Sequence, residues 1–285
     1  MPGRITVRDS VASSTAPDRT GLWLPLLQRL TATTPRWLVW KNAESAFHGT
    51  GDIDAAASTA DWPAIEEAFC DWALEGGVGP VVVCRHIPGG LNLIAVPPAS
   101  ATFLEMGVKA RRIWRGSTLF VLEDLLPMTV LDDRGFRRLR PGAEGFFKLL
   151  LNGTRRNGGV NEAGMEAKHV RELLRADPDG VRQAARRLGP ARHAALVGAR
   201  RAAAGGWDCR AMLAVQGWAL LRGLGEPRVS LARLRFRLRG RATCPVVAAI
   251  LGAGRRIPAD REAWLRQLAG DHVIHGEIGG GEPAQ

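Results

Sequence analysis

Two aspartates one residue apart, Asp52 and Asp54, are the side chains in this sequence best placed to do chemistry. They follow the turn Gly49-Thr50-Gly51 and lead into three alanines at 55–57, a small-residue run typical of a tightly packed strand. On a strand, residues i and i+2 point to the same face, so both carboxylates should project together while Ile53 enters the core. Two like charges this close repel each other unless a cation lies between them. Because hard oxygen ligands suit Mg²⁺ or Mn²⁺, the pair predicts a divalent metal site.

The plainer interpretation is a polar turn with an N-capping aspartate, because an Asp-x-Asp pattern is short and matches by chance. The flanking residues favour the chemical interpretation. The apolar run 37–40 precedes Lys41 and Asn42, and ten residues later Gly-Asp-Ile-Asp enters a second strand. This arrangement resembles the polymerase-β-like nucleotidyltransferase superfamily, in particular the bacterial branch with a Gly-Asp-Ile-Asp signature. Lys41-Asn42 stands where the superfamily usually has Gly-Ser.

The resemblance implies a third metal-binding carboxylate on a later strand, and Glu105 in the triplet Leu-Glu-Met is the acid found there. A lone Glu on a strand is otherwise a solvent-facing residue. With Asp52 and Asp54, Glu105 would hold one or two Mg²⁺ (or Mn²⁺) ions. The metal would neutralise and orient the triphosphate of ATP or another nucleoside triphosphate and lower the pKa of an attacking hydroxyl.

The resemblance also implies residues that grip the nucleotide. Lys41 can reach a phosphate as a mobile charge, although it could equally be an ordinary lysine at a strand end. Asn42 could orient Asp52 or bind a phosphate oxygen. Gly49 and Gly51 would let backbone N–H groups approach an anion. Lys148, in the helix expected at 142–153, is placed to send a basic side chain toward the triphosphate.

Composition favours an anionic partner. The 285 residues carry a formal charge of +11, and only four of the 39 basic residues are lysines. A pI near 10.9 fits binding to nucleotides, nucleic acid such as RNA, or anionic lipid surfaces. The four cysteines are far apart and lack a C-x-x-C pair, so they predict no zinc module and a reduced, cytoplasmic setting. No signal peptide or long apolar span is present, so we expect a soluble protein.

The periodicity predicts an α+β fold, with a small mixed sheet in a nucleotidyltransferase-like domain followed by an Arg-rich helical domain. We expect a disordered tail at 1–20, the catalytic domain at 21–135, the helical basic domain at 136–278 and a frayed C-terminus at 279–285. The expected strands are 37–40, 52–57, 81–87, 91–96 and 102–108. The expected helices are 22–30, 61–75, 142–153, 162–175, 180–188, 191–204, 208–222 and 260–269.

Three stretches keep more than one interpretation. The basic run 109–115, with one tryptophan, could track a phosphate backbone or be a charged edge strand, and we favour the edge strand. The stretch 119–131 is expected as a short helix or loop leaving the sheet. The run 233–241, with arginine at every second position, could be a strand with one basic face or a helix.

Three functions from different classes follow. The first is an Mg-dependent transfer of a nucleoside monophosphate to an acceptor hydroxyl on a small molecule, sugar, protein or RNA. The second is a catalytically inactive relative that binds nucleotide or RNA through its basic surface. The third is a plain basic nucleic-acid-binding protein.

Overall fold

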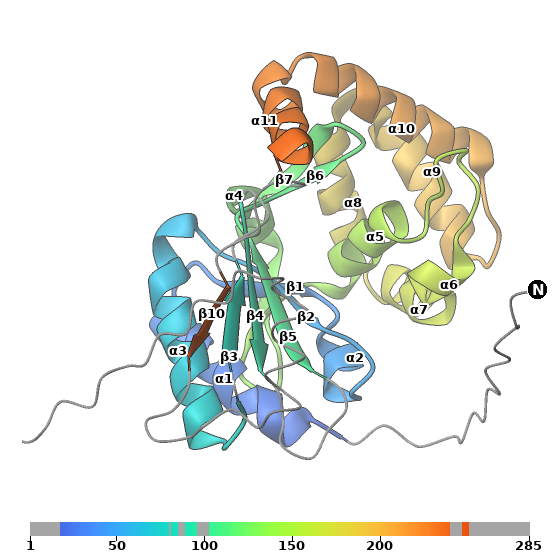
Figure 1. The fold of residues 1–285 in the computed structure, drawn as a ribbon. Coiled ribbons are helices and arrows are strands. Elements are labelled where there is room, and N and C mark those ends of the chain that lie inside the picture. The colour runs from blue at the N-terminus through green and yellow to red at the C-terminus, as the bar shows by residue number, and fades with distance from the viewer. Residues whose placement is uncertain (1–17, 80, 85–88, 96–102, 240–246, 251–285) are drawn as a thin grey trace, which may run out of the picture.

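A computed structural model describes residues 18–79, 81–84, 89–95, 103–239 and 247–250 (Figure 1). The predicted α+β class with a mixed sheet is confirmed. A sheet with helices along it forms one part of the molecule, and a group of helices gathers beyond one end of that sheet. The chain passes from the first part to the second near residue 140.

The main sheet has eight strands in the order β10-β3-β4-β5-β2-β1-β9-β8. Its strands are β1 (Leu38–Lys41), β2 (Ile53–Ala56), β3 (Val81–Cys84), β4 (Gly90–Ala95), β5 (Leu104–Lys109), β8 (Thr129–Leu131), β9 (Arg137–Leu139) and β10 (Val247–Ile250). The pairs β2–β5 and β1–β9 are parallel, and the other neighbours run antiparallel. The strands expected around 37–40, 52–57, 81–87, 91–96 and 102–108 are therefore confirmed, and the sheet continues past residue 135 through β9.

Alternation gives the sheet one apolar face. Ile53 and Ala55 of β2 are fully buried, as are the alternate residues of β4 and β5 on the same side. Helices α1 (Thr20–Thr33) and α3 (Trp62–Glu75) cover this face, and the Trp23 and Trp72 rings stack with centroids 5.3 Å apart. The other face of β2, β4 and β5 carries the polar residues Asp54, Asn92, Glu105 and Lys109, and also Ala56, which packs into the core around α5.

The helix α1 begins inside the stretch expected as a disordered tail. Thr20 is its first residue, and Asp18 accepts hydrogen bonds from the Thr20 N–H at 2.9 Å and hydroxyl at 2.7 Å. This local side-chain contact satisfies an otherwise unpaired N–H at the helix start. The expected tail therefore ends before residue 20, and residues 1–17 lie outside the described part.

The basic run 109–115 does not form one edge strand. Lys109 ends β5 near the middle of the main sheet and is 8% exposed. Residues Arg111–Trp114 form β6, which pairs with β7 (Ser117–Val121) in a separate two-stranded ribbon. The chain then makes α4 (Leu122–Leu125) and a 3-10 turn, so the stretch 119–131 contains two short strand segments as well as the expected helix.

Helices dominate after residue 140. They are α5 (Pro141–Leu151), α6 (Glu162–Met165), α7 (Ala167–Ala176), α8 (Pro178–Ala185), α9 (Arg192–Ala203), α10 (Cys209–Leu224) and α11 (Pro227–Arg239). Helix α5 is buried over most of its length and packs against α7 and α8, with Phe146 and Phe147 in the shared core. That core also takes in Leu38, Trp40 and Ala56 from the sheet, so α5 is the element that joins the two parts.

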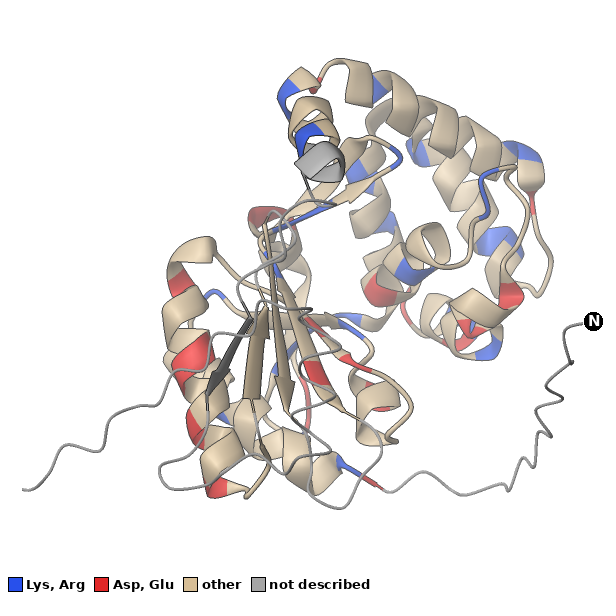
Figure 2. Ribbon diagram, viewed as in Figure 1, with Lys and Arg blue, Asp and Glu red and all other residues tan. Residues whose placement is uncertain are grey.

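The run 233–241 is helical as far as it is described, because α11 extends through Arg239. The helix expected at 260–269, the His272–His275 segment and the frayed end at 279–285 lie outside the described residues. Figure 2 shows Lys and Arg along the helices that follow the sheet and on the β6–β7 ribbon. In the described residues, the helices lack the combination of length and apolar character that a bilayer crossing requires.

One carboxylate joins α5 to α8. Asp177, just before α8, accepts hydrogen bonds from Arg140 Nε at 2.8 Å and Nη2 at 2.6 Å. It also accepts the N–H of Gly142 at 3.0 Å and of Gly180 at 2.9 Å, which caps α8. Burial acts to raise the pKa of Asp177, but the hydrogen bonds and charge of Arg140 outweigh it, so its pKa lies below the ordinary aspartate range.

We expect Asp177→Asn to lower the free energy of unfolding by about 2–4 kcal/mol, because the substitution removes the charge that pairs with Arg140 and replaces one of the two acceptor oxygens by an NH₂ donor. The loss should be full at neutral pH, since a carboxyl with a lowered folded pKa stabilises above its unfolded value of about 3.9. As the pH falls below 3.9 toward the folded pKa, wild type and variant should converge. Urea unfolding at several pH values measures this difference.

Asp179→Asn is the matched control, because Asp179 lies on the same helix with its side chain 68% exposed. Its effect should stay within about 0.5 kcal/mol. Equal effects of the two substitutions would show that Asp177 does not join the helices as described.

Candidate functional site

A polar row crosses four neighbouring strands on the sheet face opposite α1 and α3. Lys41 on β1 pairs with Asp54 on β2, Asp54 pairs with Gly107 on β5, and Gly107 pairs with Asn92 on β4. A Cβ at Gly107 would lie 3.4 Å from Asn92 Oδ1 and 3.7 Å from Asp54 Oδ1, so both side chains lean over the glycine. Because Gly107 lacks a side chain, the groups on either side of it can share one space.

The other two predicted acids belong to the adjacent row. Ile53 pairs with Met106, which brings Asp52 and Glu105 side by side on the same face as Asp54. Burial and then the charges of Asp52 and Asp54 raise the pKa of Glu105 above its ordinary value. The sheet therefore brings together the three predicted carboxylates, and they repel one another.

Asp54 is the most buried of the three, at 7% exposed, and it is not in an apolar setting. Its Oδ2 lies 2.6 Å from Lys41 Nζ and accepts a hydrogen bond from Asn42 Nδ2 at 3.1 Å. Burial raises the pKa of Asp54, Lys41 opposes that rise, and the charge of Asp52 adds to it. Lys41 is itself 9% exposed, so this is a buried ion pair rather than a solvated strand end.

Asn42 holds both aspartates. Its Nδ2 donates to Asp52 Oδ1 at 3.3 Å as well as to Asp54, so the contacts support the orienting role predicted for it. Its backbone is left-handed, with φ 69° and ψ 12°. Asn tolerates that conformation better than other residues with a Cβ, which explains why a residue other than glycine can occupy this turn.

A buried carboxylate from α5 fixes the Asn42 backbone. Glu144, 2% exposed, accepts the Asn42 N–H at 3.1 Å and binds Arg138 of β9 at 3.0 Å. Arg138 in turn binds Glu44 at 2.9 Å and Asp132 at 3.0 Å. The turn that carries Asn42 is thus held from the sheet and from α5 together.

Sequence reasoning missed Lys109, which the structure adds to the cluster. Its Nζ donates to Asn92 Oδ1 at 3.0 Å, and burial lowers its pKa while the charges of Asp54, Glu105 and Asp52 oppose that lowering. The signal was present, because Lys109 follows Glu105 by four residues and so shares its strand face. The arginines that follow Lys109 in the run 109–115 instead predict a charged edge strand.

The carboxylates do not form a ready metal site as they stand. Among the described residues, no group of three His, Cys, Asp or Glu side chains is arranged to hold a metal ion. The donor set nevertheless suits a metal ion, because three hard oxygen donors share one face of the sheet. Burial and the neighbouring carboxylates raise the pKa values of Asp54 and Glu105, and a divalent cation would favour their charged forms. Asp54 would have to release Lys41 for all three to bind a single ion.

The predicted glycines shape the approach to Asp52. Gly49 has φ +70° and its N–H donates to Ala46 within the turn at 3.0 Å. Gly51 lies against Ser45 of α2 (Ala43–Phe47), because a Cβ at Gly51 would come within 2.9 Å of the Ser45 Cβ. Ser45, which sequence reasoning did not single out, therefore borders the start of the acidic strand.

Lys148 is 1% exposed, and its Nζ lies 2.9 Å from Glu166 Oε2. The Glu166 carboxylate also lies 3.4 Å from Ser45 Oγ. Lys148, from the helical part, and Ser45, from the sheet part, are thus joined through one carboxylate beside the loop that leads to Asp52. The predicted Lys148 is thereby linked, through Glu166 and Ser45, to Gly51 in the turn before Asp52.

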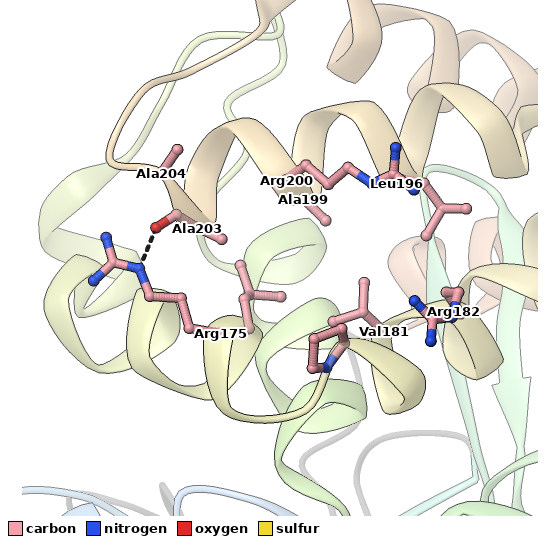
Figure 3. Close-up of a pocket in the computed structure, with 10 residues that line it drawn as sticks. Arg175, Val181, Arg182, Leu196, Ala199, Arg200, Ala203 and Ala204 are labelled. Atoms are coloured by element: carbon pink, nitrogen blue, oxygen red, sulfur yellow. Dashed lines mark hydrogen bonds between the residues drawn. The ribbon is translucent and has the colours of Figure 1, made fainter.

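A groove of about 350 Å³ lies away from these residues, between α7, α8 and α9 (Figure 3). Leu174, Val181 and Leu196 line it, with Arg175, Arg182 and Arg200 around them. The Arg175 guanidinium donates to the Ala203 carbonyl. Its lining residues include no carboxylate, histidine or cysteine, so the groove offers none of the groups that the acidic cluster provides.

Comparisons with protein-family models, curated proteins and solved structures gave no match. The functional interpretation therefore depends on the residues of this chain and their geometry.

We expect Asn42→Ala to be less stable than Asn42→Gly by about 1 kcal/mol, because alanine is strained in the left-handed conformation and glycine is not. Both variants lose the amide that bonds the two aspartates, so their difference isolates the backbone. Denaturant unfolding of the two proteins measures it. Equal stabilities would mean that the turn can relax to an ordinary backbone.

We expect Glu105→Gln to raise the melting temperature slightly in EDTA, by the equivalent of about 1 kcal/mol or less, because it removes one of three mutually repelling charges. The same substitution should abolish the stabilisation produced by Mg²⁺ or Mn²⁺. Thermal melts with and without metal test both effects.

Glu67→Gln, on the exposed side of α3, is the control and should change neither melt. A Glu105→Gln protein that still gains the wild-type stabilisation from metal would remove Glu105 from the proposed ligand set.

Proposed function

We propose that this chain is a nucleotidyltransferase that moves a nucleoside monophosphate from a nucleoside triphosphate to an acceptor hydroxyl and releases pyrophosphate, with Mg²⁺ or Mn²⁺ held by Asp52, Asp54 and Glu105. The bound metal would neutralise the triphosphate and lower the pKa of the attacking hydroxyl. The observation that carries the proposal is the placement of three acids on one polar face of two adjacent parallel strands.

The chain's own residues would do the positioning. Asn42 holds Asp52 and Asp54 in a common orientation through its two hydrogen bonds. Lys41 and Lys109 lie beside the acids and supply positive charge where a triphosphate would add negative charge. Lys41 lies 2.6 Å from Asp54, and if Asp54 held a metal, the Lys41 ammonium would be free to contact a phosphate oxygen, as predicted for it.

The proposal predicts metal-dependent transfer of label from α-phosphate-labelled nucleoside triphosphates to an acceptor pool of RNA, protein and small hydroxyl compounds. Asp54→Asn should reduce the rate at least about a hundredfold, because the substitution removes a charge that holds the metal in the transition state. Asp71→Asn, an exposed change on α3, should leave the rate unchanged. If the label stays in the triphosphate with every acceptor tested, the proposed nucleotidyl transfer is wrong.

A second candidate is a catalytically inactive protein that binds nucleotide or RNA. It is favoured by the contact between Lys41 and Asp54, which supplies a protein cation in place of a metal. Such a protein would bind the nucleotide without transfer, and its affinity for RNA would fall steeply with salt. Its RNA affinity would also be the same in wild type and Asp54→Asn, because basic side chains and not the acids would carry the binding.

A further inference from the structure

A buried lysine needs a counter-charge. Lys148 is 1% exposed and lies on α5 between core residues that include Phe147 and Leu149. An ammonium in such surroundings is very costly unless an anion is beside it. Among the described residues, its one ion pair is with Glu166, at 2.9 Å.

Glu166 is an unusual residue to provide that charge. Its side chain is 48% exposed, so it can leave for solvent without being buried elsewhere. It sits between α6 and α7 with φ 52° and ψ 61°, a left-handed conformation that is strained for a residue with a Cβ. Burial acts to raise the pKa of Glu166, but the hydrogen bond and charge of Lys148 hold it below its ordinary value, so the side chain is an anion at neutral pH.

The Glu166 carboxylate also lies beside the Ser45 hydroxyl. Its two oxygens lie 3.4 Å from Ser45 Oγ, which is long for an O–H···O hydrogen bond. Ser45 in turn abuts Gly51, one residue before Asp52. The Ser45 hydroxyl, which is weakly hydrogen-bonded, and the buried Lys148 ammonium therefore share the Glu166 carboxylate at the edge of the acidic cluster. A phosphate group would offer both residues more acceptor oxygens and more negative charge than a carboxylate does.

We propose that Lys148 and Ser45 form a polyphosphate subsite and that Glu166 is a resident anion that the incoming polyphosphate displaces. The inference rests on the proposed function, since it supplies the place for the outer phosphates of the same nucleotide. In the free protein Glu166 neutralises Lys148. With the polyphosphate bound, the Glu166 side chain turns to solvent. The nucleotide binds less tightly than it would without Glu166, because part of its binding free energy is used to displace the Glu166 carboxylate from Lys148.

The test measures binding of inorganic tripolyphosphate in EDTA by titration calorimetry. Glu166→Gln should bind it on the order of tenfold more tightly than wild type, because the competing charge is gone. The variant should also melt at a lower temperature without ligand and gain more from tripolyphosphate, since Lys148 then lacks its own counter-charge. A residue that served only to stabilise the fold would not tighten binding when replaced.

Glu162→Gln is the matched control, because Glu162 lies on α6 and meets Arg171 only at 3.8 Å. It removes the same charge and should leave affinity within about twofold of wild type. Ser45→Ala should weaken binding by a few fold through loss of one hydrogen bond. If Glu166→Gln does not fold, Glu166→Asp replaces it, since its shorter reach weakens the pair, and tighter binding is again the expected result.

Equal or weaker tripolyphosphate binding by Glu166→Gln would overturn the inference. The outcome is separable from that of the proposed function. If Glu166→Gln binds tripolyphosphate more tightly but wild type transfers no label, the role of Glu166 as a displaced anion stands, and the protein binds nucleotide without catalysing transfer. If wild type transfers label but Glu166→Gln binds tripolyphosphate less tightly, the proposed activity stands. Glu166 then supports the ligand instead of competing with it.

Discussion

The buried ion pair between Lys41 and Asp54, 2.6 Å apart, is the constraint on which the rest of the site depends. Both residues lie on the sheet face that α1 and α3 leave uncovered, where the strands carry their polar alternates. A buried carboxylate beside two others needs positive charge nearby, which Lys41 and Lys109 supply, while the neutral Asn42 amide donates a hydrogen bond to Asp54. The acids thus lie close together, and burial and mutual repulsion raise the pKa values of Asp54 and Glu105.

Helix α5 gives that cluster its frame. From its first turn, Glu144 fixes the backbone of Asn42, and from its last turn Lys148 reaches Glu166 beside Ser45. The helix is buried against both the sheet and its helical neighbours, so the two parts of the chain cannot separate without breaking the polar contacts at each end. The helical part therefore belongs to the site rather than being only a basic attachment to it.

Pattern reasoning located most of the sheet because its strands are short, apolar and alternating, and it placed Asp52, Asp54 and Glu105 on strands for the same reason. It failed where a residue's partner is distant in sequence. Lys109 was assigned to a basic edge because the arginines after it suggested one, whereas pairing with β4 and β2 puts it inside the sheet. The break of the helix expected at 162–175 into α6 and α7 at Glu166 had no sign in the periodicity.

The sequence by itself determined which side chains could do chemistry, since period-two alternation puts Asp52 and Asp54 on one strand face whatever the rest of the chain does. Only the tertiary structure decided that β2 and β5 are parallel neighbours, that Lys41 is buried against Asp54, and that Glu166 meets Lys148. The physical reason is that strand pairing and buried charge pairs join residues far apart in the chain, and their free energy depends on burial that no local pattern specifies.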